Sequence, residues 1–162
     1  MRTINTIVLH CTATREDQQL SPRDLNTMHR KRGFNGCGYH YYITRDGEIY
    51  PMRPDANPGA HAKGHNANSI GIAYEGGLDV DGNPKDTRTG QQKRSIRILL
   101  RVLMTDYKDI TKVVGHRDLS PDLDGNGIVE PHEWTKQCPC FDVQAEYGEL
   151  VKSLIDRRNI PE

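Results

Sequence analysis

The feature that most constrains the fold is a nearly continuous apolar run at residues 69–74, Ser-Ile-Gly-Ile-Ala-Tyr. A short run without polar alternation is typical of a strand that is buried on both faces of a sheet. The clearest helical pattern follows at residues 89–107, where apolar side chains recur at helical spacing. Its stripe consists of Ile96, Leu99, Leu100, Leu103 and Met104. Together these segments predict a mixed α/β fold.

Further elements fit this pattern. The expected strands are short and β-branched or aromatic, and they cover residues 6–10, 39–44, 48–52, 69–74 and 113–114. Asp46-Gly47 indicates a hairpin. A helix begins at Ser21-Pro22 and ends at Gly33, with Leu25, Met28 and His29 on one face, and a last helix covers residues 141–157. With no repeat or linker, residues 1–162 form one domain: a central mixed sheet of about five to six strands flanked by helices.

Charge and hydropathy exclude several classes of protein. The formal net charge is zero, so the composition gives no reason to expect binding to nucleic acid. The basic group Lys93, Arg94, Arg97 and Arg101 has helical spacing and indicates a solvated helix face. No apolar run approaches a membrane span, and the N-terminus lacks a signal-peptide core. We therefore expect a protein that is made in the cytoplasm and is not inserted into a membrane. We also expect a monomer, although the sequence does not specify the oligomeric state.

Two histidines and a cysteine stand where a sheet would bring them together. His10 and His116 each follow a short apolar strand, and Cys138 follows a loop and precedes Pro139. Two imidazoles and a thiolate can hold zinc and leave a fourth position for water, whose pKa the ion lowers to about 7. Residue types alone favour the plainer interpretation of hydrogen-bonded histidines and a buried cysteine.

Local motifs change this balance. Six segments occur in order: Val8-Leu9-His10-Cys11-Thr12-Ala13-Thr14, Gly38-Tyr39-His40, Gly59-Ala60-His61-Ala62-Lys63-Gly64, Asn68-Ser69-Ile70-Gly71-Ile72, Gly115-His116-Arg117-Asp118 and Lys136-Gln137-Cys138-Pro139. Together they resemble the type-2 N-acetylmuramoyl-L-alanine amidases, the family of the lysozyme of T-odd coliphages, which is related to animal peptidoglycan recognition proteins. The resemblance runs from about Ile4 to Asp142.

This resemblance implies an amidase fold, a zinc ion on His10, His116 and Cys138, and catalytic roles for Tyr39 and Lys136. The chemistry agrees, because attack on an amide carbonyl creates an oxyanion that a fixed cation or donor stabilises. The family carries a further carboxylate after the Ile-Gly-Ile segment in some members. Here Ala73 follows Ile72, so we leave Glu75 out of the catalytic set.

The resemblance also implies a substrate: peptidoglycan, cut between the lactyl group of N-acetylmuramic acid and L-alanine. Its substrate-facing segment supplies His61, Lys63, His65 and Asn68. His40 follows Tyr39 in the expected strand and should face the other side of the sheet in a structural role. We expect His29 and His132 on the surface.

An acidic segment at residues 122–133 matches the template of a calcium-binding loop. Its ligands would be Asp122, Asp124, Asn126, Ile128, Glu130 and Glu133, the isoleucine through its carbonyl. Gly127 permits the sharp turn, but Ser120-Pro121 argues against an entering helix. Calcium binding and a merely solubilising acidic turn both stay open.

Two questions about the cysteines also stay open. Cys11 and Cys37 could oxidise outside the cell. Cys140 competes with Cys138 as the thiolate ligand, although the Cys-Pro pair of the family favours Cys138 and Pro139 stiffens the turn between the two.

Two functions are therefore compared. The first is a phage- or prophage-type endolysin, or a wall-remodelling amidase, which without a signal peptide reaches the wall through holin-type release or lysis. The second is a non-catalytic peptidoglycan-binding recognition module. Such modules typically lose the third zinc ligand, so the presence of Cys138 with Tyr39 and Lys136 favours the enzyme.

Overall fold

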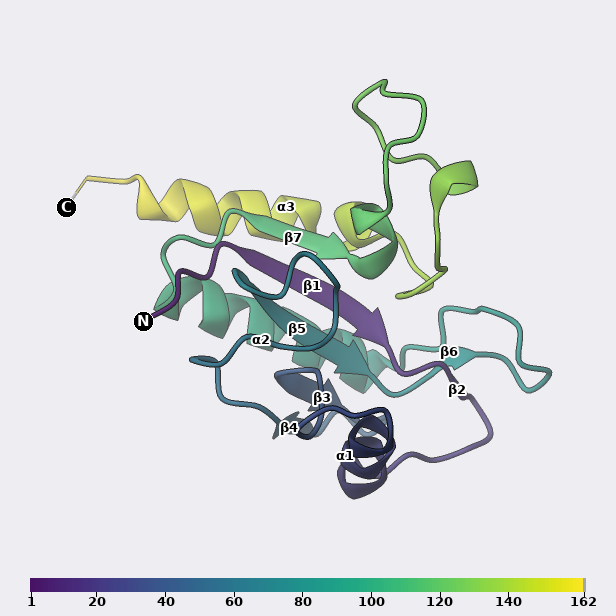
Figure 1. Cartoon of the computed structure of the whole chain (residues 1–162). Helices are drawn as coiled ribbons and strands as arrows, with labels where there is room; N and C mark the ends of the chain where they lie inside the picture. The colour runs from purple at the N-terminus through teal and green to yellow at the C-terminus, as the bar shows by residue number, and fades with distance from the viewer. Residues whose placement is uncertain (162) are drawn as a thin grey trace.

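A computed structural model describes residues 1–161 and contains one five-stranded sheet in the order β4-β3-β5-β1-β7 (Figure 1). The predicted domain ends at Glu162, which lies outside the described residues. The strands of this sheet are β1 (Thr6–Cys11), β3 (Tyr41–Ile43), β4 (Ile49–Pro51), β5 (Ser69–Tyr74) and β7 (Lys112–Gly115). The prediction of a mixed α/β fold with a central sheet is confirmed.

Strand β5 occupies the centre of the sheet, as its apolar run predicts. It pairs in parallel with β1 and with β3, and all six of its residues are buried. β1 pairs in parallel with β7 on its other side, and β3 forms the antiparallel hairpin with β4 around Asp46-Gly47. The parallel core places the carboxyl ends of β1 and β7 at one edge, which is where His10 and His116 lie.

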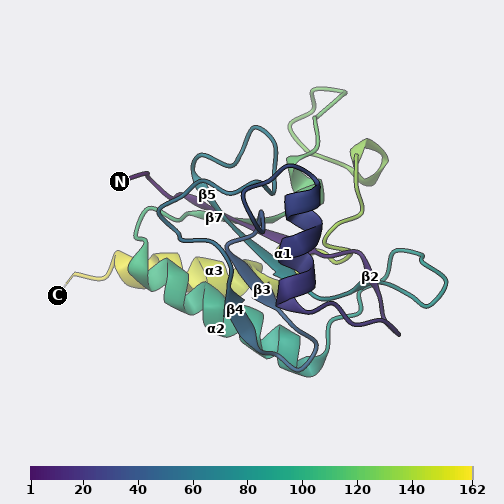
Figure 2. The same cartoon turned by 60° about the horizontal axis from the view of Figure 1, so that its bottom comes forward.

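Among residues 1–161, three α-helices cover the sheet: α1 (Pro22–Lys31), α2 (Gly90–Asp106) and α3 (Val143–Arg158). α2 and α3 lie together on one face and α1 lies on the other (Figures 1 and 2). Side-chain caps begin each helix, with Ser21, Thr89 and Asp142 accepting from backbone N–H groups of the first turn. Within the described residues, none of the helices is long and apolar enough to span a membrane.

The alternation of strand residues separates a core face from a functional face. Ile7 and Leu9 of β1, with Ile70 and Ile72 of β5, pack in the large apolar core beneath α2 and α3. Alternate residues point the other way, so His10, next to Ala73 in the register, lies on the face that α1 partly covers. Strand β1 thus buries one face in the apolar core and presents the other face, with His10, to the site.

The structure corrects several local predictions. Residues 38–40 form bends before β3 begins at Tyr41, so Tyr39 is not on a core strand. In α1, Leu25 and His29 are buried whereas Met28 is 47% exposed. His29 is therefore not a surface residue, because the helix rotates it toward the sheet with Leu25, four residues earlier.

A second, two-stranded sheet was not anticipated. It pairs β2 (Thr14–Arg15) with β6 (Gly77–Leu78), just beyond the ends of β1 and β5. Strands this short leave little periodic signal in the sequence. The basic residues of α2 (Lys93, Arg94, Arg97 and Arg101) are exposed, which confirms a solvated helix face.

Candidate metal centre and substrate groove

His10, His116 and Cys138 meet at the edge of the sheet. One ligand atom from each lies within 4.8 Å of the other two, and the imidazole Nδ1 of His10 is 3.8 Å from the sulfur of Cys138. The ring centroids of His10 and His116 are 4.6 Å apart. His10 is 1% exposed, whereas His116 and Cys138 are half-buried.

Each of the three residues is fixed by its local structure. His10 is the next-to-last residue of β1, and His116 begins a 3-10 helix, His116–Leu119, directly after β7. The segment around Cys138 is tied to that helix, because its carbonyl accepts the N–H of Arg117 at 2.8 Å. The backbone N–H of Cys11 donates to the Cys138 sulfur at 3.3 Å, which ties this sulfur to the end of β1.

Burial keeps the two imidazoles in the neutral form that a metal requires. Desolvation lowers the pKa of His10 well below its usual value, and it lowers the pKa of His116 to about 4 with a smaller effect from the charge of Lys136. Neutral imidazoles offer a lone pair to a cation without first losing a proton.

These donors fit zinc. A tetrahedral zinc ion has ligand bonds of about 2.0–2.1 Å to nitrogen and about 2.3 Å to sulfur, which separates a nitrogen from a sulfur by roughly 3.6 Å. The 3.8 Å between His10 Nδ1 and Cys138 Sγ is close to that value. Two nitrogens and one sulfur leave a fourth position, which is typical of a catalytic zinc site and not of a structural one.

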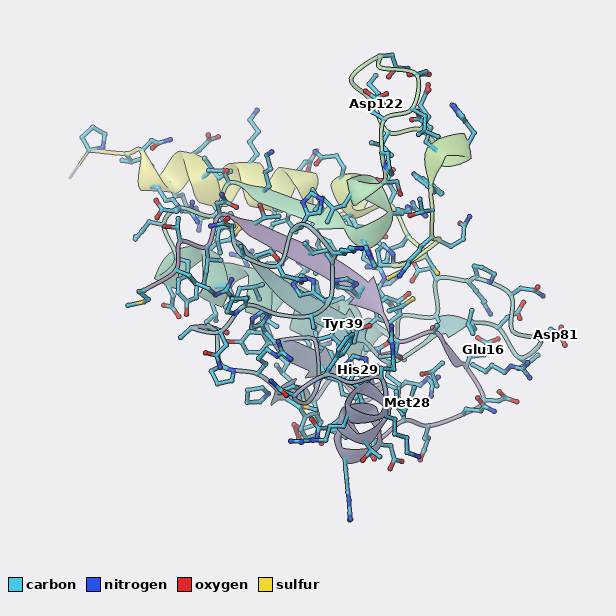
Figure 3. All side chains as sticks on the ribbon, viewed as in Figure 1. Glu16, Met28, His29, Tyr39, Asp81 and Asp122 are labelled. Atoms are coloured by element: carbon cyan, nitrogen blue, oxygen red, sulfur yellow. The ribbon has the colours of Figure 1, made fainter. Side chains whose placement is uncertain are left out.

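Tyr39 and Lys136 both lie at this cluster. The ring of Tyr39 is 5.0 Å from that of His10 and 5.2 Å from that of His29 (Figure 3). Burial raises the pKa of the Tyr39 hydroxyl, so it stays a proton donor at neutral pH. Lys136 is exposed, lines the same cleft and is close enough to lower the pKa of His116.

His29 is a residue of this cleft that the sequence interpretation missed. It lines the cleft beside Tyr39, and its Nδ1 accepts the N–H of Gly38 at 2.7 Å. This bond holds the turn that presents Tyr39. The helical spacing from Leu25 was the signal that could have identified it as buried.

The expected substrate-facing residues divide into two groups. Lys63 and His65 line a cavity of about 550 Å³ that shares His61, His116 and Lys136 with the metal cleft. Arg32 and Phe34, which the sequence interpretation did not single out, close its other side. Asn68 lines a neighbouring cavity of about 460 Å³, where its side chain donates to the carbonyl of Thr3.

His61 is largely hidden from this groove. It is 8% exposed, and both of its ring nitrogens lie within hydrogen-bond distance of protein atoms, Nδ1 at 2.8 Å from His10 Nε2 and Nε2 at 3.1 Å from Ser69 Oγ. His40 packs beside it with ring centroids 5.9 Å apart. The prediction that His40 faces the other side of the sheet is wrong, because residues 38–40 do not follow strand alternation.

His40 nevertheless has the expected structural role. Its Nδ1 accepts the N–H of Gly71 at 3.0 Å, and its Nε2 is 2.8 Å from the carbonyl of Asn57. Glu75 is structural as well, since its carboxylate accepts the backbone N–H groups of Leu20 and Arg45.

The remaining cysteines are not part of the cluster of ligands. The sulfur of Cys140 is 3.9 Å from that of Cys11. The side-chain contact with Cys138, followed by burial, raises the pKa of the Cys11 thiol to about 12, whereas the contact with Cys11, followed by burial, raises the pKa of the Cys140 thiol. Cys37 packs in the apolar group beneath α1 instead. All four cysteines are free thiols, and Cys11 lies beside Cys140 and not beside Cys37.

The acidic segment forms a loop that projects from the domain, with Asp122 well away from Tyr39 and His29 (Figure 3). Ser120 and Thr135 close its base through a 3.1 Å bond from the Thr135 N–H to the Ser120 hydroxyl. Asp122, Asp124 and Glu133 bring one oxygen each within 4.8 Å of the others. His132 is exposed, as expected.

Comparison with known proteins gives a consistent assignment. The family "N-acetylmuramoyl-L-alanine amidase" matches residues 1–140. The endolysin of Enterobacteria phage T3 is 35% identical over 93% of this chain and 91% of its own length. A solved structure, the endolysin amidase LysCS from Clostridium intestinale URNW, is 32% identical with a TM-score of 0.71 over 92% of this chain and 84% of that one. Drosophila PGRP-LB, at 24% identity and a TM-score of 0.67 over 91% and 81%, shares the fold.

The sheet with its histidine- and cysteine-bearing edge therefore defines a peptidoglycan amidase fold. The chain belongs to the N-acetylmuramoyl-L-alanine amidase family, and it is an amidase of that class.

Proposed function

We propose that this protein is a zinc-dependent N-acetylmuramoyl-L-alanine amidase that cuts the amide between the lactyl group of N-acetylmuramic acid and L-alanine. The observation that carries the proposal is the meeting of His10, His116 and Cys138 within 4.8 Å in a cleft open to a groove. Zinc bound there would supply Lewis acidity for attack on the amide carbonyl.

The chain's own residues would orient the amide and stabilise developing charge. Lys136 lies two residues before a ligand and offers a fixed positive charge beside His116. Tyr39 keeps its proton at neutral pH and can donate a hydrogen bond to an oxygen at the centre of the cleft. Such preorganised donors act on charge that appears only in the transition state.

The groove suits a glycan with an attached peptide. Polar and cationic side chains line the cavity of about 550 Å³, with Lys63 and His65 on one side and Arg32 on the other. We therefore include Lys63 and His65 in the substrate-binding region, with His61 at its base, and extend this region to the neighbouring cavity that Asn68 lines. The proposed partner is bacterial peptidoglycan, and we propose an endolysin role after holin-type release or lysis, which the similarity to a phage endolysin supports.

Purified protein incubated with muropeptides tests this proposal. Mass spectrometry should show free stem peptide beginning with L-alanine, its release should stop with a zinc chelator, and added zinc should restore it. Binding of muropeptides without cleavage would contradict the enzyme and favour a recognition module. Cleavage that persists in chelator would contradict zinc dependence alone.

We also propose that the projecting loop binds calcium. In support, the segment matches the loop template at each ligand position, Asp122, Asp124, Asn126, Ile128, Glu130 and Glu133. Two groups of side chains bring oxygens or an imidazole nitrogen within 4.8 Å of one another, and they share Asp124. The ion would have a structural role, because the loop's base leads directly to Lys136 and Cys138.

A further inference from the structure

A chain of hydrogen bonds runs from the back of the metal cluster into the protein. It leaves the cluster at His10 Nε2, the ring nitrogen away from Cys138, and reaches His61 Nδ1 at 2.8 Å. It continues from His61 Nε2 to Ser69 Oγ at 3.1 Å, and from that hydroxyl to the carbonyl of His65 at 2.7 Å. His10, His61 and Ser69 are all buried.

The hydrogen bond from Ser69 to the carbonyl of His65 determines which atom donates in each of the other hydrogen bonds. A carbonyl can only accept, so the Ser69 hydroxyl donates its proton to His65 and turns a lone pair toward His61. His61 Nε2 therefore carries a proton and donates it. A neutral His61 then has its lone pair on Nδ1, which accepts from a proton on His10 Nε2.

The same tautomer follows from the metal side. A protein ligand must offer a lone pair, and the nitrogen of His10 nearest the Cys138 sulfur is Nδ1. A neutral imidazole with its lone pair on Nδ1 carries its proton on Nε2. The metal site at one end of these hydrogen bonds and the carbonyl of His65 at the other thus require the same positions for the protons.

The surrounding backbone makes room for this chain. A side chain at Gly71 would place its first carbon 2.6 Å from the His61 ring, and one at Gly59 would place it at 2.5 Å. Both distances are far below ordinary contact, so each glycine permits the ring to lie against the backbone. Asn66 fixes the loop itself, because its side-chain oxygen accepts the N–H groups of His61 and Ala62.

We propose that His61 and Ser69 are positioning residues that hold His10 in the tautomer and orientation with Nδ1 toward the metal. A ligand histidine usually donates its second N–H to a carboxylate or a carbonyl. Here a second imidazole and a hydroxyl extend that contact to the carbonyl of His65. The ligand keeps its geometry without a buried negative charge behind it.

This inference rests on the proposed zinc site, and zinc affinity tests it. His61→Leu should weaken zinc binding about 10- to 100-fold, the usual cost of losing such a partner. Ser69→Ala, a smaller change, should weaken it less, and His61→Asn should recover part of the loss because its side-chain oxygen lies near the former Nδ1. Ser95→Ala removes a buried hydroxyl that bonds the carbonyl of Gly47 on the other face, and it should leave zinc affinity unchanged.

Affinity would be measured by competition with a chromophoric chelator, after circular dichroism has shown that each variant is folded. Long-range proton–nitrogen NMR of the metal-free protein reports the tautomer of His10, which would not change if His61 and Ser69 only stabilised the fold. It should show His10 protonated on Nε2 in the wild type and a mixture of tautomers in His61→Leu, or in Ser69→Ala if the first does not fold.

Zinc affinity of folded His61→Leu within twofold of the wild type would overturn the inference, and so would a wild-type His10 protonated on Nδ1. If the wild type bound no zinc, the proposed function would fail. In that case the NMR measurement alone would show whether His61 and Ser69 determine the tautomer of His10.

Discussion

Two regions of this molecule bring metal-binding side chains together, and they do so in opposite ways. The cluster of His10, His116 and Cys138 draws its members from the ends of two parallel strands and a tied segment more than a hundred residues from the first. The loop at residues 122–133 draws all of its candidate ligands from one short stretch. In the first, His10 is buried and His116 and Cys138 are half-buried, whereas the second projects into solvent (Figure 3).

The difference lies in what already satisfies the donor atoms. In the loop, Glu133 accepts the N–H groups of Leu123, Asp124 and Glu130, and Asp122 accepts those of Gly125 and Gly127. In the buried cluster, His10 Nδ1 and the Cys138 sulfur face each other at 3.8 Å, and neutral imidazoles leave their lone pairs free. The fold therefore leaves the donor atoms of the cluster free for a cation, whereas the carboxylates of the loop already accept hydrogen bonds from the loop's own backbone.

Removal of a ligand should have the largest effect. We expect Cys138→Ala to reduce both zinc affinity and amidase activity by more than about 100-fold, beyond the usual cost of losing an indirect partner. Cys140→Ala is the matched control two residues away, and Asp124→Asn is the control in the loop. Metal analysis and peptide release would measure the effects. Loss of zinc with Cys140→Ala but not with Cys138→Ala would overturn the ligand assignment.

The two hydrogen-bond donors at the cleft should matter for rate and not for metal content. Lys136→Ala and Tyr39→Phe each remove one donor at the cleft, and we expect kcat to fall about 100-fold while bound zinc stays the same. Steady-state kinetics with a muropeptide, together with zinc analysis, would separate these effects. Exposed Lys93→Ala on α2 is the control. Full activity in both cleft variants would remove Lys136 and Tyr39 from the catalytic set.

A fall in pH should lower the stability of the protein first through its buried histidines and only at lower pH through the carboxylates of the loop. Burial lowers the pKa of His61 to about 3 and that of His116 to about 4, whereas unfolded histidine has a pKa of about 6.5. Between these values the unfolded chain binds more protons, so the free energy of unfolding of the metal-free protein falls as the pH drops below about 6.5. His61 can contribute up to about 1.4 kcal/mol per pH unit, and His116, closer to solvent, contributes less.

The loop carboxylates behave differently. Backbone N–H groups lower the pKa of Asp122 and of Glu133, so their contribution is present above about pH 4 and is lost only as the pH falls further. Urea unfolding at a series of pH values would measure both ranges. A flat profile between pH 6.5 and 4.5 would contradict the account of the histidines.

Calcium should give the smallest effect. We expect it to raise the melting temperature of the wild type by a few degrees, because an ion that binds only the folded state stabilises it. Replacement of Asp122 and Asp124 by alanine should abolish this response. Asp122 also holds its own turn, so Asp124→Asn is the milder variant. Differential scanning calorimetry with calcium and with chelator measures the shift, and an equal loss under both conditions would rule out calcium.

The sequence predicted the scaffold better than the contacts around the site. The buried run at residues 69–74 and the stripe of α2 specify a central strand and its covering helix because burial demands their composition. The family motifs then selected His10, His116 and Cys138, which single residue types could not. Short strands β2 and β6 carry too little periodicity to be seen.

The errors share a physical origin. His29 was expected on the surface and His40 on the opposite face of the sheet by strand alternation, but α1 turns His29 toward the sheet and residues 38–40 are bends. The role of Ser69 depends on a carbonyl four residues earlier and an imidazole eight residues earlier, which only the folded loop brings together. Side-chain contacts of this kind follow from tertiary structure and leave no local pattern.

X-ray absorption at the zinc edge of the zinc-loaded protein tests the central claim most directly. We predict one sulfur at about 2.3 Å and two imidazole nitrogens at about 2.0–2.1 Å, with the sulfur shell absent in Cys138→Ala. A first shell of oxygens alone, unchanged in Cys138→Ala, would place the ion elsewhere and contradict the assignment of His10, His116 and Cys138.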